Sequence, residues 1–273
     1  MKKQEIAKHF EKSVKFLSGK KIQTIIIIFL LLAILTFGAW IRIQNIPALK
    51  DVTTGEYIPI ELDTFYFLRI AETIVEHGKL PEYDNMRDPM TPNVEWAPDI
   101  LPKIIVLIYK IINALNFKAS LHFADIIYPV IYFILSVIAF FFLIYFLTKS
   151  KWLALISSGL LAVIPPFLYR TMAGFSDHDI LGMFAFFLAL LSFTATLKIV
   201  EKKKKSWTAF ILGGLITGIS LTFTLVSWGG VSKFLFMTLP VAFLILWLTK
   251  IKEKEILPKY LGYYVFLIVG VFI

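Results

Sequence analysis

Two short acidic segments stand out in a chain that is otherwise strongly apolar. Glu61 and Asp63 are two positions apart, and Asp177 and Asp179 repeat this spacing with His178 between them. On an extended or loop backbone this spacing points both carboxylates to one side, which suits an oxygen-seeking cation such as Mg²⁺ or Mn²⁺. Ionised groups beside membrane hydrocarbon are costly and therefore rare, so these segments are candidates for a functional site.

Each acidic segment also has a purely structural interpretation. Asp63 and Asp177 stand where helices are expected to begin, and a carboxylate there can cap free backbone N–H groups. Together, however, the segments could supply the three or more hard ligands that a Mg²⁺ site needs. The predicted ligands are Asp63, Asp177 and Asp179. Glu61 is a further candidate, and His178 is either a nitrogen ligand, which Mn²⁺ accepts better than Mg²⁺, or a polar neighbour.

Two residues near the acidic segments suit the handling of a phosphate-bearing lipid. Arg170 precedes Asp177 by seven positions, and a guanidinium beside a metal is a good phosphate clamp. Its alternative role is a membrane anchor whose charged end reaches water. Trp228 is followed by Gly229 and Gly230, which permit a close backbone approach or a positive φ. A tryptophan by itself is also typical of the membrane interface.

The composition indicates a membrane protein. Apolar residues make up 58% of the 273 residues, and 26 of them are Phe. The net charge of +9 does not indicate nucleic-acid binding, because most Lys and Arg lie in short runs between apolar stretches. We therefore expect a lipid bilayer and no nucleic acid as a partner. The absence of cysteine excludes disulfides and thiolate metal sites.

Six apolar runs approach the ~20 residues that a helix needs to cross a bilayer. They cover residues 22–42, 124–147, 152–169, 180–199, 207–228 and 233–249, and a seventh begins near Tyr260. The predicted fold class is therefore an all-α, multi-pass membrane protein. The last run is still apolar at Ile273, so we expect residues 22–273 to be the transmembrane domain of a longer protein, without its C-terminal soluble domain.

The placement of lysines predicts the orientation. Residues 1–21 and the connections after the second, fourth and sixth runs are Lys-rich, which places them in the cytoplasm. The connections 43–123, 170–179 and 229–232 then face outside, and they contain or border every candidate residue. Within the long loop 43–123, apolar residues recur at helical spacing from Asp63 to His77 and from Ile104 to Leu115. This pattern predicts two amphipathic helices, the second lying against the membrane.

Three segments together resemble motifs of oligosaccharyltransferase catalytic subunits, first the archaeal and then the bacterial ones. These are residues 61–66 (ELDTFY) followed by Leu68 and Arg69, residues 169–179 (YRTMAGFSDHD) and residues 228–230 (WGG). The resemblance extends over the whole chain in its order of helices and its long first external loop. It implies the GT-C glycosyltransferase fold.

The resemblance also implies an activity. Such enzymes transfer an oligosaccharide from a polyprenyl (dolichyl) phosphate carrier to the asparagine of an Asn-x-Ser/Thr acceptor. By the same resemblance, Asp63 binds the divalent cation near the acceptor amide, Asp177 and, variably, Asp179 are metal ligands, and Arg170 contacts the lipid phosphate. The family's later acidic residue and its W-W-D-Y-G segment do not occur in this chain. Two alternatives remain, another polyprenyl-phosphate-dependent transferase of the same fold and a membrane transporter. The clustering of charges at one surface, away from the bilayer midplane, disfavours the transporter.

Overall fold

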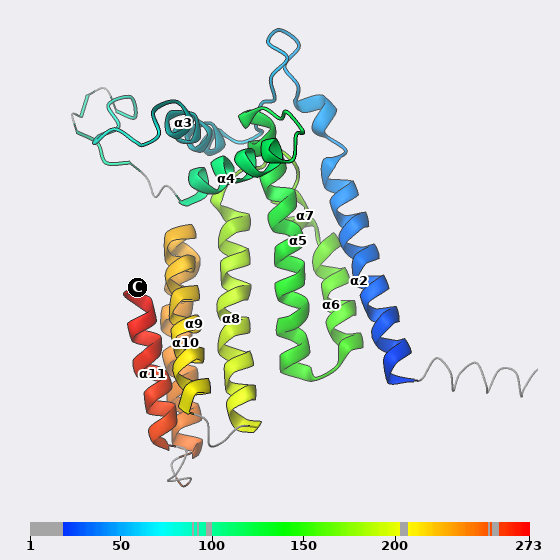
Figure 1. Ribbon diagram of the computed structural model, residues 1–273, viewed down its shortest axis with the longest axis vertical. Helices are drawn as coiled ribbons and strands as arrows, with labels where there is room; N and C mark the ends of the chain where they lie inside the picture. The colour runs from blue at the N-terminus through cyan, green and yellow to red at the C-terminus, as the bar shows by residue number, and fades with distance from the viewer. Residues whose placement is uncertain are drawn as a thin grey trace, which may run out of the picture.

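The computed structural model describes residues 19–88, 90–91, 93–96, 100–202, 207–250, 252 and 257–273. Most of the predicted cytoplasmic N-terminus (1–18) and parts of the Lys-rich connections near 203–206 and 253–256 lie outside the described residues. The described part is helical, with one isolated β-bridge between Lys50 and Tyr57 (Figure 1). Its elements are α2 (Lys20–Ile43), the 3-10 turn η1 (Ile46–Leu49), α3 (Leu62–His77), α4 (Ile100–Ala114), α5 (Leu121–Thr148), α6 (Lys151–Val163), α7 (Pro165–Tyr169), α8 (His178–Lys202), α9 (Trp207–Ser227), α10 (Gly229–Lys250) and α11 (Leu257–Val271).

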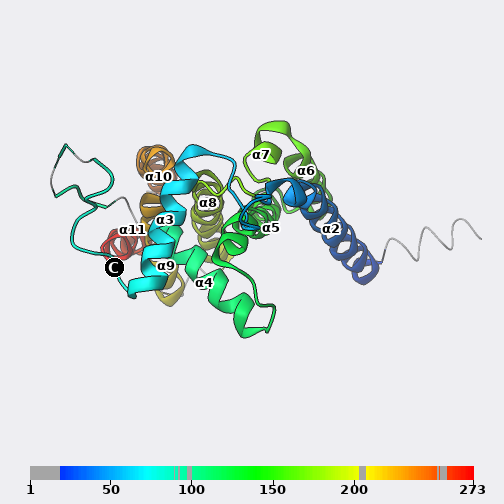
Figure 2. The same ribbon diagram turned by 90° about the horizontal axis from the view of Figure 1, so that it is seen from above.

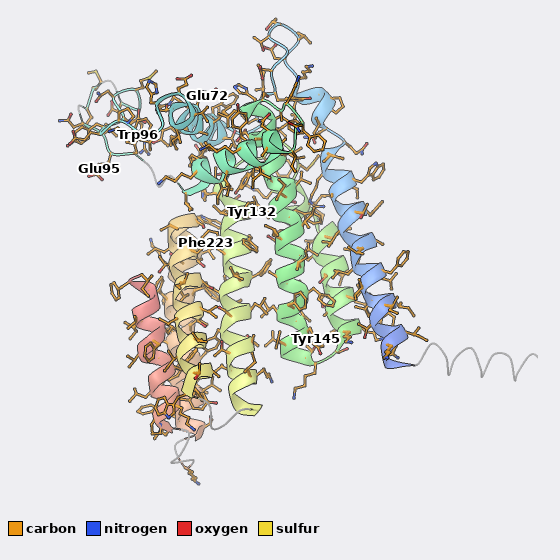
Figure 3. The ribbon with its side chains drawn as sticks, viewed as in Figure 1. Glu72, Glu95, Trp96, Tyr132, Tyr145 and Phe223 are labelled. Carbon is orange, nitrogen blue, oxygen red and sulfur yellow. The ribbon has the colours of Figure 1, made fainter. Side chains whose placement is uncertain are left out.

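The apolar helices form a bundle with roughly parallel axes. Within the described residues, α2, α5, α8, α9 and α10 are long and apolar enough to cross a membrane, and α6 and α11 are shorter apolar helices. Aromatic side chains link neighbouring helices through the middle of the bundle. Phe184 of α8 contacts Tyr132 of α5 and Phe223 of α9, with ring centroids 5.5 and 6.1 Å apart (Figure 3). The predicted all-α, multi-pass fold class is confirmed.

The two predicted amphipathic helices lie across one end of this bundle (Figures 1 and 2). α3 covers the predicted residues and ends at Gly78, whose φ of 75° is the left-handed conformation that favours glycine after a helix. α4 begins about one turn earlier than predicted. It buries Leu101 and Ile105 in the same apolar core as residues of α5, so it forms a lid over the bundle.

The predicted third run, 152–169, is interrupted at Pro165 and Pro166, as two adjacent prolines predict. α6 ends at Val163, Ile164 is extended with ψ 127°, and Pro165 and Pro166 begin the short α7. A proline has no N–H to continue a helix, and its ring disfavours helical geometry in the preceding residue. The chain therefore leaves the bundle direction just before Arg170.

The expectation of a connection at 229–232 is also wrong. α9 ends at Ser227 and α10 begins at Gly229, so that only Trp228 separates the two helices. Neither Gly229 nor Gly230 is among the glycines with positive φ. A Cβ on Gly229 would meet no atom within 4 Å, so the close approach predicted for this glycine is absent from the described structure.

The backbones of α9 and α11 approach each other closely. A Cβ on Gly218 would lie 2.2 Å from the backbone O of Leu267 and 2.7 Å from Cα of Gly270. Tyr263 of α11 donates a hydrogen bond to Thr217 Oγ1 of α9 at 3.0 Å. Small residues that let helix backbones approach are a common basis of helix association in membranes, because the hydrophobic effect does not drive apolar helices together in lipid.

Candidate functional site

The two acidic segments lie at the same end of the bundle, where α3 begins and where the connection between α7 and α8 crosses over (Figure 1). The backbone N–H of Ile60, directly before Glu61, donates to the carbonyl of Gly174 at 2.9 Å. Gly174 has φ 85°, and a Cβ there would lie 2.7 Å from Cδ1 of Leu49. Glycine therefore lets the strand-like segment before α3 rest directly on the connection that carries Asp177.

The connection 171–177 is buried and held from two further helices. Its Ala173 N–H donates to the carbonyl of Arg42 in α2 at 2.9 Å, and its Gly174 N–H donates to the carbonyl of Ile126 in α5 at 2.8 Å. Ser176 Oγ donates to the carbonyl of Asp125 at 2.7 Å, so its side chain bonds to α5. The local backbone around Asp177 is thus fixed by tertiary hydrogen bonds.

Asp177, His178 and Asp179 form a compact group of potential metal ligands. One ligand atom from each lies within 4.8 Å of the other two. Both the backbone N and the ring Nδ1 of His178 donate to Asp177 Oδ1, at 2.6 and 2.5 Å. Carboxylate oxygens and imidazole nitrogens are both ligands that divalent cations bind, so these residues fit the predicted metal site.

The Asp177 carboxylate is held in its ionised form. Its burial by itself raises the pKa, but the hydrogen bonds from the His178 side chain and backbone, with the charges of His178 and Arg170, keep the pKa below its ordinary value. The side chain of Asp177 is only 10% exposed. A buried acceptor that stays charged is suited to binding a cation.

Glu61 and Asp63 lie beside this group and not within it. Glu61 occupies the N-cap position of α3 without a side-chain cap bond, and Asp63 is an exposed residue of the first turn. Both are near enough for their charges to act on the group, Asp63 on His178 and Glu61 on Asp179. The structure therefore brings Asp177 and Asp179 together, with the first acidic segment close by. That Asp63 binds the same cation as Asp177 and Asp179 stays a prediction.

Arg170 pairs with the second aspartate of the group. Its Nη1 lies 2.9 Å from Asp179 Oδ2, and its guanidinium stands 4.8 Å from the ring centroid of Phe175. The Arg170 side chain is 49% exposed, so it remains accessible to a ligand. The ion pair and the ring contact hold the guanidinium in place next to Asp179.

Arg170 and Asp179 are the charged residues that line a groove of about 480 Å³ between α6, α7 and α8. Its other walls are largely apolar. The lining residues are Leu161, Ile164, Pro166, Phe167, Arg170, Thr171, Asp179, Ile180, Met183 and Trp228. A largely apolar groove that also contains an arginine suits an amphiphilic ligand whose head group is an anion.

Trp228 separates this groove from a second cavity. The second cavity, of about 240 Å³, is lined by Trp228, His178 and Phe67 together with residues of α4 and of the end of α9. The rings of Trp228 and His178 meet edge to face with centroids 5.6 Å apart. The ligand group at Asp177–Asp179 therefore borders two cavities, and Trp228 lines both.

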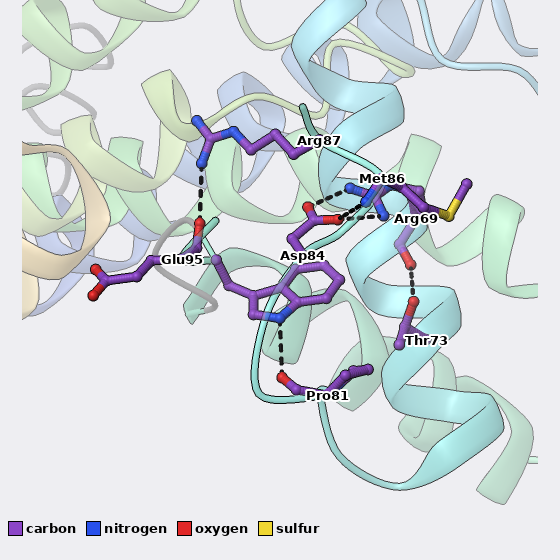
Figure 4. Close-up of polar contacts among 8 residues, drawn as sticks. Arg69, Thr73, Pro81, Asp84, Met86, Arg87 and Glu95 are labelled. Carbon is purple, nitrogen blue, oxygen red and sulfur yellow. Dashed lines mark hydrogen bonds and ion pairs between the residues drawn. The ribbon is translucent and has the colours of Figure 1, made fainter. Parts of the chain in front are cut away.

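One cluster near the site could not be predicted from the sequence pattern. Arg69 of α3 donates from Nη1 and Nη2 to the two oxygens of Asp84, at 3.0 and 2.5 Å (Figure 4). The Arg69 guanidinium also lies over the rings of Tyr66 and Trp96, at 5.2 and 5.3 Å. Asp84 is 1% exposed. This clasp, formed by Tyr66, Arg69, Asp84 and Trp96, fixes the following loop to the helix that carries Asp63.

Comparison with known proteins agrees with this geometry. Residues 25–273 match the family model described as oligosaccharyl transferase STT3, N-terminal. The chain belongs to the STT3 family. Two curated STT3-like relatives from Archaeoglobus fulgidus are dolichyl-phosphooligosaccharide-protein glycotransferases 1 and 2. Each is 28% identical over 59% of this chain, and the chain spans about a quarter (26%) of their length.

Solved structures of an STT3-type enzyme from the same organism share the fold. The archaeal oligosaccharyltransferase AglB, in complex with an inhibitory peptide and a dolichol-phosphate, has a TM-score of 0.63 at 20% identity, over 81% of this chain and 26% of its own. A complex of the Archaeoglobus fulgidus oligosaccharyltransferase with Zn and sulfate gives a TM-score of 0.61 at 17% identity, over 89% of this chain and 35% of its own. At this identity the structures show the common fold.

Proposed function

We propose that this protein transfers an oligosaccharide from a polyprenyl (dolichyl) phosphate-linked donor to the asparagine of Asn-x-Ser/Thr acceptors. One observation carries the proposal. A largely apolar groove is lined by the Arg170–Asp179 ion pair, and Asp179 also belongs to the ligand group with Asp177 and His178. A site that holds an anionic lipid head beside a cation site is what lipid-phosphate chemistry requires. The relatives' names, dolichyl-phosphooligosaccharide-protein glycotransferases, support the same activity.

The groove binds the lipid-linked donor in this proposal. Apolar side chains of α6 and α8, such as Leu161 and Met183, contact the polyprenyl chain. Arg170 donates to the phosphate with its remaining N–H groups, because its ion pair with Asp179 involves Nη1 and a guanidinium has five N–H donors in a fixed plane. The phosphate is then held next to Asp179 and the ligand group. A relative of the same fold was solved with a dolichol-phosphate.

We assign the metal site to Asp63, Asp177 and Asp179, with Glu61 and His178 as neighbours that adjust it. The contact geometry of Asp177, His178 and Asp179 fits an Mn²⁺ or Mg²⁺ ion. When bound, the cation offsets the negative charge that develops on the departing phosphate oxygen. The protein's own part is to keep the Asp177 carboxylate ionised, which the hydrogen bonds from His178 support, and to hold Asp179 beside it.

Asp63 orients the acceptor. It is exposed at the start of α3, near enough for its charge to act on His178, and in this proposal it accepts a hydrogen bond from the acceptor asparagine N–H. An amide nitrogen is a poor nucleophile, so its orientation toward the anomeric carbon is the main contribution that a carboxylate can make here. The clasp of Arg69 and Asp84 keeps this end of α3 and its loop in one arrangement.

The site faces the outside of the cell membrane in this proposal, and the N-terminus faces the cytoplasm. Lys149 and Lys151 lie at the end of the bundle opposite α3 and α4 (Figure 1), as the positive-inside rule requires of a cytoplasmic connection. Residues 22–273 form the transmembrane domain, with residues 43–123 as an external loop. Cysteines introduced at Asn93 and Ser150 test this orientation: in intact cells, an impermeant reagent should label the first and not the second.

The activity is tested by glycan transfer in membranes that contain the complete protein. The donor is a dolichyl-phosphate-linked oligosaccharide, and the acceptor is a peptide with an Asn-Val-Thr sequon. Mass spectrometry should find the glycan on the asparagine, and a Gln-Val-Thr control peptide should stay unmodified. If the glycan appears on a lipid or hydroxyl acceptor and the sequon peptide stays unmodified, the protein is another kind of polyprenyl-phosphate transferase.

A further inference from the structure

Arg42, near the end of α2, is a fully buried arginine that the proposed function does not use. Its side chain is 0% exposed. Three of its N–H groups donate to neutral oxygens: Nε to Thr171 Oγ1 at 2.6 Å, Nη1 to the Gly38 carbonyl at 2.9 Å and Nη2 to the Ala162 carbonyl at 3.0 Å. No ion pair of Arg42 with a carboxylate occurs among the described residues. Burial of a charge without an opposite charge is costly, so this arrangement needs a reason.

The surroundings of Arg42 are shaped for a guanidinium. Its Cζ lies 3.5 Å from the ring centroid of Phe133, within the range of a cation–π contact. A Cβ on Gly38 would lie 2.5 Å from Cζ of Phe133, so glycine is needed for this ring to reach the arginine. The site is therefore formed by residues of α2 and α5 that fit each other closely.

The double proline explains one of the acceptors. In a continuous helix the N–H of residue 166 would donate to the carbonyl of residue 162. Pro166 has no N–H, so the carbonyl of Ala162 at the end of α6 lacks its usual donor. Nη2 of Arg42 takes this place. Arg42 thus stabilises the break between α6 and α7 that turns the chain toward Arg170.

Arg42 holds the connection beyond Arg170 as well. Thr171 Oγ1 accepts from Nε of Arg42 and donates to the Phe167 carbonyl at 2.5 Å. The carbonyl of Arg42 accepts from the Ala173 N–H, and the Asn45 side chain donates to the Ala173 carbonyl at 2.8 Å. Phe167, Arg170 and Thr171 all line the groove. The backbone on both sides of Arg170 is therefore fixed from the end of α2.

We propose that Arg42 is a positioning residue for donor binding, which holds Thr171 and the backbone of Arg170 so that the Arg170 guanidinium meets the donor phosphate at the groove. The inference rests on the proposed function of the groove. Arg42 contacts Thr171 from behind the groove wall, and it is not itself a lining residue. Its unneutralised charge adds a fixed positive field behind that wall, which acts strongly because little water screens it. An apolar residue of similar size would fill the space but supply neither the hydrogen bonds nor the field.

The test compares the variants Arg42→Met, Arg42→Lys and Thr171→Val in the complete protein. Met is about as long as the aliphatic part of arginine and has no charge. Val replaces the Thr171 hydroxyl by a methyl group, so neither substitution introduces a clearly larger side chain. Equilibrium binding of radiolabelled dolichyl phosphate gives the donor Kd, and glycan transfer gives kcat and the acceptor KM. Tyr263→Phe is the matched control, because it removes one buried hydrogen bond, to Thr217, far along the chain in α11.

We expect Arg42→Met and Thr171→Val to raise the donor Kd about tenfold, the effect of one lost charge-assisted hydrogen bond. The acceptor KM should not change, and Tyr263→Phe should bind the donor as the wild type does. Arg42→Lys should recover part of the affinity, because it keeps the charge but not the three directed N–H groups. In the Arg170→Ala background, the additional change Arg42→Met should raise the donor Kd by much less than tenfold, because Arg170 is no longer there to be positioned and only the field of Arg42 is lost. Wild-type donor affinity in Arg42→Met, or fully additive losses in the double variant, would overturn the inference.

Hydrogen exchange separates failure of this inference from failure of the proposed function. Amides of residues 171–174 should exchange faster in Arg42→Met than in the wild type, and at the wild-type rate in Tyr263→Phe. If Arg170→Ala binds dolichyl phosphate as tightly as the wild type, the groove is not the phosphate site and the proposed function fails. In that case the exchange rate decides whether Arg42 positions this segment, and an unchanged rate refutes the positioning role too.

Discussion

Arg170 Nη1 lies 2.9 Å from Asp179 Oδ2, and this contact joins the groove to the ligand group. Asp179 belongs to both, since it lines the groove and lies within 4.8 Å, ligand atom to ligand atom, of Asp177 and His178. In the proposed function, a phosphate bound by Arg170 would therefore lie next to the residues that would hold a cation. The predictions for Arg170 and for the metal depend on this arrangement.

Arg170→Lys should weaken donor binding clearly, and Arg170→Ala should weaken it more. Lysine keeps the charge and can still reach water, but it lacks the planar group that donates two parallel hydrogen bonds to a phosphate. We expect the donor KM to rise about tenfold for Lys. The measurement is transfer rate against donor concentration, with protein levels in the membrane checked. A residue that only anchors the helix would tolerate lysine with an unchanged donor KM.

Removal of the metal should abolish glycan transfer. EDTA should stop the reaction, and Mn²⁺ or Mg²⁺ should restore it. Asp63→Asn and Asp177→Asn should each lower metal affinity by more than about 100-fold, the upper end of what loss of a ligand's hydrogen-bonding partner costs, whereas a lost helix cap costs ~1 kcal/mol of stability. Glu76→Gln is the matched control, because it removes an exposed carboxylate from the same helix as Asp63. Equal, mild effects of all three variants would return the aspartates to a structural role.

The clasp between Arg69 and Asp84 should depend on pH. Burial of Asp84 raises its pKa, but the hydrogen bonds and charge of Arg69 outweigh this and bring the pKa below its ordinary value. A depressed folded-state pKa gives stability that is fully present above the unfolded value of about 3.9 and is lost as the pH falls through the lowered value. The loop should therefore stay closed at neutral pH and open only in strong acid.

Asp84→Asn should remove that behaviour. At neutral pH, loss of the ion pair should lower the free energy of opening of residues 84–96 by about 1–3 kcal/mol, measured by amide hydrogen exchange. Glu95→Gln removes an equal charge from the same loop without touching Arg69, so its exchange should match the wild type. An Asp84→Asn protein with unchanged exchange at neutral pH would show that the clasp does not stabilise the loop.

Gly218→Ala should destabilise the packing of α9 on α11. The added Cβ would lie 2.2 Å from the backbone O of Leu267, which cannot move as a side chain could, so the helices must separate. Such overpacking costs about 1–3 kcal/mol. Thermal unfolding in detergent should show a lower midpoint. Gly159→Ala serves as the control, because the nearest atom to its Cβ is the flexible Ile34 Cδ1 at 3.5 Å.

Local patterns predicted the parts of the fold that local physics decides. The apolar spacing of α3 and the glycine after His77 define that helix and its end in sequence alone, and the structure confirms both. The acidic segment at Asp177 was recognisable by its spacing. Pro165 and Pro166 are likewise a local signal for a bend or stop in the run 152–169, and the structure shows this break at Ile164.

Contacts between distant residues could not be predicted. Arg42 is an ordinary helix-end arginine in sequence, and its burial follows from Thr171, 129 residues later, and from the missing N–H of Pro166. Arg69 likewise pairs with Asp84 in a loop without a periodic pattern. The position of Asp63 outside the ligand group depends on how α3 rests on the bundle, which no spacing encodes.

The most direct test of the account is to map where the donor lipid binds. A photoreactive dolichyl phosphate should label the groove between α6 and α8, at residues such as Leu161, Ile164 and Met183, and unlabelled dolichyl phosphate should compete while dolichol competes poorly. A third cavity, of about 210 Å³ between α9, α10 and α11, provides the internal comparison. It is lined by residues such as Phe236 and Tyr264 and has almost no polar surface. Labelling of the groove that Arg170→Ala reduces is the predicted result. Labelling confined to the α9–α11 cavity would contradict the account. The account would also be contradicted if dolichol blocked labelling of the groove as well as dolichyl phosphate does.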